Sequence, residues 1–94
     1  MTDIELARTL RILRRTVLML QTELRNDHLD AALLDEIDAQ MERGIGTDPR
    51  CTRLRSAVDA LRESTLTPRA ELMRDAARTC EQLKDAIEEV VVRL

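Results

Sequence analysis

The chain has 94 residues, of which 44% are hydrophobic and 35% are charged, and its formal net charge is −3. This composition is typical of one small helical soluble domain and excludes a disordered chain, because the apolar fraction is high enough to form a core. There is no Phe, Tyr or Trp, which excludes the usual stacking platforms for bases, sugars and flat cofactors.

Acidic residues stand near the start of the chain, at Asp3 and Glu5, and no long apolar run follows. We therefore expect no signal peptide, no transmembrane span and a cytoplasmic protein. Cys51 and Cys80 lack C-x-x-C spacing, so we expect reduced thiols that act as small core residues. A regulatory or intersubunit disulfide is the alternative.

The first expected helix covers residues 2–25. Thr2 and Glu5 have the spacing of a capping box, in which Thr2 accepts from the amide three residues on. Apolar residues then recur at steps of four and three, which places them along one face of a helix about 35 Å long. This heptad seam consists of Leu6, Leu10, Leu13, Val17, Leu20 and Leu24. The opposite side carries Arg8, Arg11, Arg14 and Arg15.

A second helix is expected over residues 27–43, with Asp27 as its N-cap and Asp30 in its first turn. Residues 27–48 carry seven acids and one arginine, a net charge of −6. We interpret this as an acidic helix packed beside basic ones; the alternative is an acidic docking surface for a basic partner. Its apolar positions are Leu29, Leu33, Leu34, Ile37 and Met41.

The only histidine, His28, lies in the first turn of this expected helix, between Asp27 and Asp30. We expect a solvated side chain there. The alternative is a general base or a metal ligand, but a transition-metal site normally needs more imidazole or thiolate ligands than this stretch offers.

Both glycines of the chain, Gly44 and Gly46, fall in the stretch MERGIGTDPR. Gly44 suits the left-handed position just past a helix end, while Asp48 and Pro49 suit the N-cap and first position of the next helix. A phosphate-binding loop would need GxxxxGK[ST] after a strand, and the stretch has neither feature. We predict a short connector between helices.

The third and fourth helices are expected over residues 48–63 and 67–94, the fourth opened by Thr67 and Pro68. The third has apolar residues at steps of three and four: Cys51, Leu54, Val58 and Leu61. The fourth has a seam broken only at Lys84: Leu66, Ala70, Met73, Ala77, Cys80, Ile87, Val91 and Leu94. Leu72, Ala76, Leu83 and Val90 widen this face to an arc of about 160°, which indicates two neighbouring helices.

Short connectors make sequential helices antiparallel. The sequence therefore predicts a single all-α domain over residues 1–94, an up-and-down bundle of about four helices with long first and last members. We expect one or two of these long helices to overhang the bundle, and the overhang to expose apolar residues at the end of the chain, which a partner would cover.

No catalytic or cofactor-binding motif is present, so we expect neither an enzyme nor a cofactor or metal site. We expect a non-catalytic helical interaction module, such as a small adaptor, chaperone-like or regulatory protein, that binds a partner protein or itself as a homodimer. The expected interface residues lie off the first seam or at the chain end: Ile12, Met19, Val90, Val91 and Leu94.

The alternative is a small DNA- or RNA-binding regulator that uses the third helix behind a helix–turn–helix connection. Its contact residues would be Arg50, Arg53, Arg55 and Arg62. The acidic second helix and the negative net charge make nucleic acid the less favoured partner, because both repel phosphates.

Overall fold

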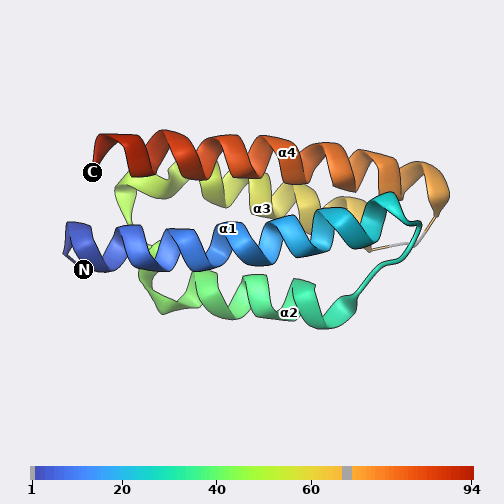
Figure 1. The fold of residues 1–94 in the computed structure, drawn as a ribbon, viewed down its shortest axis with the longest axis horizontal. Helices are drawn as coiled ribbons and strands as arrows, with labels where there is room; N and C mark the ends of the chain where they lie inside the picture. Colours follow the sequence, from blue (N-terminus) through green and yellow to red (C-terminus); the bar gives the residue numbers. More distant parts are fainter. Residues whose placement is uncertain (1, 67–68) are drawn as a thin grey trace.

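The computed structural model describes residues 2–66 and 69–94, and within them the chain forms an antiparallel bundle of α-helices (Figure 1). The predicted all-α, up-and-down architecture is confirmed. In chain order the elements are α1 (Asp3–Arg25), α2 (Ala31–Gln40), a wide turn η1 (Met41–Ile45), a 3-10 turn η2 (Pro49–Cys51), α3 (Thr52–Thr65) and α4 (Ala70–Arg93).

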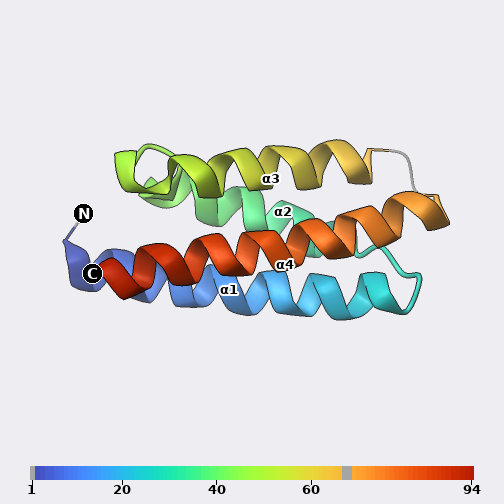
Figure 2. The same ribbon diagram turned by 90° about the horizontal axis from the view of Figure 1, so that it is seen from above.

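The two long helices, α1 and α4, pack against each other along their length and form the most extensive helix pair (Figures 1 and 2). α1 begins as predicted, since Thr2 Oγ1 accepts a hydrogen bond from the Glu5 amide at 3.2 Å. Its predicted seam is confirmed along its whole length, because each member is at most 2% exposed: Leu6, Leu10, Leu13, Val17, Leu20 and Leu24.

α2 begins later than predicted. Its first residue is Ala31, and its N-cap is Asp30, whose side chain accepts from the Ala32 amide at 3.0 Å. The predicted N-cap, Asp27, has a φ of 57°, whereas an N-cap residue normally has extended backbone. The prediction of Asp27 as N-cap is therefore wrong, and Asp30 has that role.

Asp27 instead closes α1. The Asp27 amide donates to the Leu24 carbonyl at 3.0 Å, and the His28 amide donates to the Glu23 carbonyl at 2.9 Å. This is the Schellman pattern, in which a left-handed residue just past the helix satisfies its last carbonyls. Aspartate adopts that conformation more readily than most residues, so no glycine is needed here.

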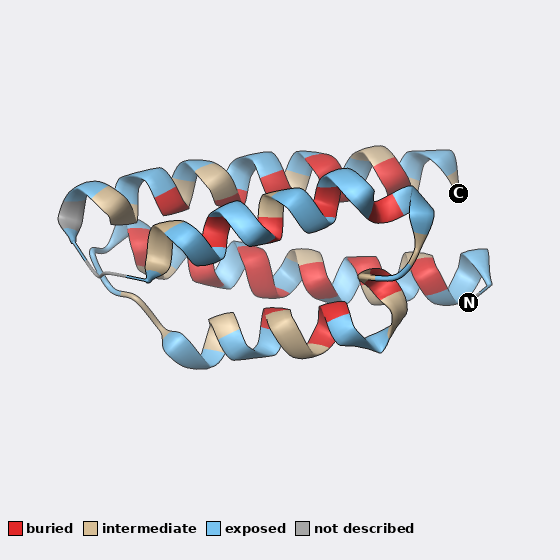
Figure 3. Cartoon of the chain, turned by 180° about the vertical axis from the view of Figure 1, so that it is seen from behind, coloured by how far each residue is buried: buried red, intermediate tan, exposed pale blue. Residues whose placement is uncertain are grey.

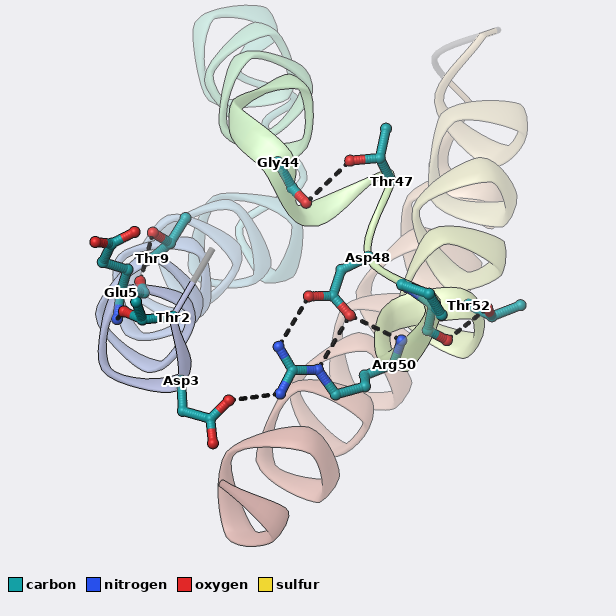
Figure 4. Close-up of polar contacts among 10 residues, drawn as sticks. Thr2, Asp3, Glu5, Thr9, Gly44, Thr47, Asp48, Arg50 and Thr52 are labelled. Carbon is teal, nitrogen blue, oxygen red and sulfur yellow. Dashed lines mark hydrogen bonds and ion pairs between the residues drawn. The ribbon is translucent and has the colours of Figure 1, made fainter.

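The turn between α2 and α3 is built from the residues that were predicted for it. Gly44 has a φ of 110°, in the left-handed region. Asp48 is the N-cap of the next helical segment and accepts from the Arg50 amide at 2.9 Å, and Pro49 occupies the first position (Figure 4). The predicted connector is confirmed, although regular α-helix ends at Gln40 rather than at residue 43.

α4 lies between α1 and α3 (Figure 2) and contacts both. Its buried residues are Ala76, Cys80, Leu83, Ala86, Ile87 and Val90. Five of these six, all but Ala86, belong to the seam and the flanking residues predicted for this face, and the two neighbours that its width indicated are α1 and α3. Leu66, which was assigned to that seam, is the C-cap of α3 and 79% exposed. The predicted helix start at Thr67 and Pro68 lies outside the described residues.

Two buried glutamines form hydrogen bonds between helices inside the core, where only apolar residues were expected. Gln40 is 2% exposed and donates from Nε2 to Thr16 Oγ1 at 3.1 Å, which joins α2 to α1. Gln21 is 1% exposed and donates from Nε2 to Glu81 Oε2 at 2.7 Å, which joins α1 to α4. These bonds are directional, so they favour one axial alignment of the helices over a slide by one turn.

Neighbouring helices of the bundle do not all contact one another to the same extent. α2 packs on α1 and α3 packs on α4, but α2 and α3 make few contacts with each other. The buried positions of every helix face the interior (Figure 3). No described helix has an apolar stretch long enough to cross a membrane. The bundle measures 39 × 21 × 18 Å, and its open side lies between α2 and α3.

Candidate partner-binding surfaces

One face of α1 points away from the core and combines apolar and basic side chains. At 100° per residue its members fall within an arc of about 100° opposite the buried seam. We call this face the α1 strip; it consists of Ile4, Arg8, Arg11, Ile12, Arg15 and Met19. Most of these residues line one shallow depression on the helix surface.

The apolar members of the α1 strip are solvent-accessible. Ile4 is 76% exposed, Ile12 is 48% exposed and Met19 is 52% exposed. Leu18 stands beside them and is 42% exposed. Single exposed apolar residues are normal on a protein surface, but several in a row along one helix face are of the kind that partners cover.

The arginines of the α1 strip are not neutralised within the described chain. Arg8, Arg11 and Arg15 form no ion pair with any residue of 2–66 or 69–94, whereas Arg14, outside the strip, lies 3.2 Å from Glu88 of α4. The strip therefore carries three uncompensated positive charges. A complementary acidic surface would be attracted to it, and the attraction would weaken with salt.

The chain-end residues predicted for the same interface lie elsewhere. Val90 is 8% exposed and belongs to the core, and Val91 and Leu94 are half-buried against it. Only Val92 is widely exposed, at 80%. α1 and α4 do extend beyond α2 and α3 (Figure 1), but the predicted exposure of Val90, Val91 and Leu94 is wrong, because the last turn of α4 lies beside the first turns of α1.

Each arginine proposed for nucleic-acid binding is held by the protein itself. Arg50 donates to Asp48 and, at 2.8 Å, to Asp3 at the start of α1 (Figure 4). These hydrogen bonds hold the pKa of the Asp48 carboxyl below its ordinary value and raise the pKa of Arg50. The sequence did not indicate this contact between the start of α1 and η2.

The other three arginines of that set also have intramolecular partners. Arg53 lies 2.6 Å from Glu89 of α4, and Arg62 lies 2.9 Å from Asp38 of α2. Arg55 donates to the Gly46 carbonyl at 2.7 Å. These side chains therefore hold α3 to neighbouring elements. Fewer guanidinium N–H groups are then free to donate to phosphates.

A groove between α2 and α3 is a second candidate surface, and sequence reasoning missed it. Its first section has a volume of about 270 Å³, with Met41 and Val58 on its floor. A second section, of about 150 Å³, continues past Leu34 to Leu66. The Asp38–Arg62 ion pair lines both sections. We call the two sections together the α2/α3 groove.

The rim of the α2/α3 groove is predominantly acidic. Asp35, Glu42 and Asp59 line it and form no ion pair with another described residue, while Asp38 is paired with Arg62. Arg55 is the remaining base of the lining. Asp35, Asp38 and Glu42 belong to the acidic stretch 27–48, so part of that stretch lines a depression that the sequence pattern alone did not reveal.

The candidate catalytic side chains, His28, Cys51 and Cys80, lie on different elements and do not form one site. His28 is exposed, with Nδ1 2.7 Å from Glu23 Oε2. Cys51 and Cys80 are free and buried, and burial raises the pKa of both thiols, that of Cys80 to about 12. Within residues 2–66 and 69–94, no three His, Cys, Asp or Glu side chains are grouped so as to hold a metal ion.

Comparison of the chain with protein-family models, with curated proteins and with solved structures finds no match. The functional argument therefore depends on the surfaces described above.

Proposed function

We propose that this protein is a non-catalytic helical interaction module that binds a protein partner through the α1 strip. The observation that carries the proposal is that Ile4, Ile12 and Met19 stay exposed on a helix whose opposite face is the core. An apolar stripe on a rigid helix is the feature that helix-binding partners bury. Burying one such side chain completely contributes about 1.5–3 kcal/mol.

The charges of the strip define the partner that we propose for it. Arg8, Arg11 and Arg15 lie between the apolar residues, and none is paired with a described acid. An amphipathic surface that is acidic at its edges would match both features. Complementary charge speeds encounter and excludes basic competitors, while the apolar contacts supply most of the affinity.

A nucleic-acid regulator that uses α3 is less well supported. Its four arginines are already engaged with Asp48, Asp3, Glu89, Gly46 and Asp38. The chain also has no aromatic residue to stack on bases. Release of those intramolecular bonds would oppose phosphate binding, so a protein partner is the simpler proposal.

The decisive experiment compares partner capture by three forms of the full chain. The test variant is Ile12→Asp with Met19→Asp. The control is Ala60→Asp with Gln82→Asp, which introduces the same charge at two exposed helix positions outside both surfaces. Each form is immobilised and exposed to native lysate with and without nuclease treatment, and bound proteins are identified by mass spectrometry.

We expect one identified protein to bind the wild type and the control but not the test variant. Its purified form should bind the test variant at least about tenfold more weakly, the loss expected from truncating a central contact. Identical capture by all three forms would overturn the proposal. Binding that disappears with nuclease would instead favour the nucleic-acid alternative.

A further inference from the structure

The α1 strip and the α2/α3 groove are complementary in charge. The strip is an exposed helix face with three unpaired arginines, and the groove is a depression between two helices with three unpaired acids, Asp35, Glu42 and Asp59. The strip extends about 22 Å from Ile4 to Met19, and the helical lining of the groove extends about 12 Å from Leu34 to Glu42, at 1.5 Å per residue.

We propose that the α1 strip of one copy docks into the α2/α3 groove of a second copy. This inference rests on the proposed function of the strip and names a second copy of this chain as its occupant. Ile12 and Met19 would cover the exposed Leu66 and the half-buried Leu34. The arginines of the strip would face the acidic rim.

A symmetric contact between two α1 strips is the competing arrangement for self-association. It would bring two sets of Arg8, Arg11 and Arg15 together, with no acid in either strip to separate them. Like charges that face each other across an interface cost several kcal/mol. Docking of the strip into the groove replaces this repulsion with attraction, so the structure favours the strip–groove contact.

The strip and the groove are different surfaces of one chain, so the contact is head-to-tail. After one such contact forms, the assembly still has a free groove at one end and a free strip at the other. Such heterologous contacts produce either closed rings or open chains. Two copies close into a dimer only if both strip–groove contacts form at once, and otherwise association continues beyond a dimer as concentration rises.

A charge-exchange experiment tests the contact on the purified full chain by sedimentation velocity over a range of concentrations. The strip variant carries Arg8→Glu, Arg11→Glu and Arg15→Glu. The groove variant carries Asp35→Arg, Glu42→Arg and Asp59→Arg. All six positions are exposed and unpaired within the described chain, and circular dichroism checks that each variant keeps its helices.

We expect the wild type to associate, with weaker association as salt is raised. Each variant alone should be monomeric, because strip and groove then have the same sign. An equal mixture of the two should associate again, because the opposite signs are restored. Milder variants, with Gln or Asn at the same positions, should weaken association at least about tenfold.

Two results would overturn this inference. One is a wild type that stays monomeric at every concentration. The other is a groove variant that associates as strongly as the wild type. In either case the proposed function would stand if the partner identified from lysate is still lost on Ile12→Asp with Met19→Asp. If that pair of changes leaves partner capture unaltered, the proposed function fails as well.

Discussion

The Gln40 side chain donates a hydrogen bond to Thr16 Oγ1 at 3.1 Å inside the interface between α1 and α2. Its own Oε1 is buried and has no partner among the described residues. Gln40 therefore helps to align the two helices but leaves one buried acceptor without a hydrogen bond. Substitutions can distinguish the effect of the hydrogen bond on stability from that of the side-chain volume.

Gln40→Met should leave the free energy of unfolding within about 1 kcal/mol of the wild type, because it keeps the volume and removes the unsatisfied oxygen. Gln40→Ala should lower it by about 1–3 kcal/mol, because the side-chain volume becomes a cavity. Urea unfolding followed by circular dichroism measures both. Equal losses in the two variants would show that the hydrogen bond, and not the volume, carries the stability.

Val90→Asp should lower the free energy of unfolding much more than substitutions in the α1 strip do. Val90 is buried among apolar neighbours, so a carboxylate there should lower the free energy of unfolding by about 3 kcal/mol or more. Ile12→Asp with Met19→Asp should cost no more than about 1 kcal/mol in total, since both side chains are exposed. Thermal unfolding of the three forms provides the comparison, and comparable losses would contradict the assignment of Val90 to the core.

The stability of the protein should depend on pH through Asp48. Hydrogen bonds from Arg50 hold the pKa of the Asp48 carboxyl below its ordinary value of 3.8. A lowered folded-state pKa contributes stability that is present above the unfolded pKa and is lost as pH falls through the folded value. This contribution should therefore be lost as the pH falls below the ordinary carboxyl pKa of 3.8 and through the lower folded-state pKa.

Asp48→Asn keeps a side-chain acceptor for the N-cap and removes the charge. The variant should be less stable than the wild type at neutral pH, and the difference should shrink as the pH falls below the ordinary carboxyl pKa. Asp85→Asn, at an exposed position without an ion pair in the described chain, is the matched control. A difference between wild type and Asp48→Asn that is independent of pH would contradict this assignment.

Gly44 should tolerate asparagine better than alanine. Its φ of 110° is in a region that L residues with a Cβ seldom adopt. We expect Gly44→Ala to lower the free energy of unfolding by about 1–2 kcal/mol, and Gly44→Asn to cost less, because asparagine enters left-handed conformations more readily. Equal costs in the two variants would indicate a steric cause and not a conformational one.

The fold could be predicted from the sequence where one helix face meets one continuous core. The α1 seam is such a case, because every step from Leu6 to Leu24 is three or four residues. The α4 face was predicted as a wide arc for two neighbours, and among the described residues of α4 Ala86 is the one buried residue that was not assigned to it. Asp27 and Asp30 both belong to a residue type that is favoured at N-caps. Asp27 is excluded as the N-cap of α2 because its backbone forms the C-terminal hydrogen bonds of α1, which the sequence does not show.

The candidate surfaces were predictable in part. Ile12 and Met19 could be found because they interrupt the polar side of a regular helix. The α2/α3 groove could not, because it results from the spacing of two helices that share few contacts. The bonds of Arg50 to Asp3 and of Arg62 to Asp38 join residues far apart in the chain, which periodicity does not encode.

The attachment of α2 to the bundle has a consequence for motion. α2 packs mainly on α1, so its detachment would expose few core residues and leave the α1–α4 and α3–α4 contacts in place. Local opening of this kind needs less free energy than global unfolding. Backbone amides of α2 should therefore exchange with deuterium before those of α1 and α4, and occupancy of the α2/α3 groove should slow that exchange first.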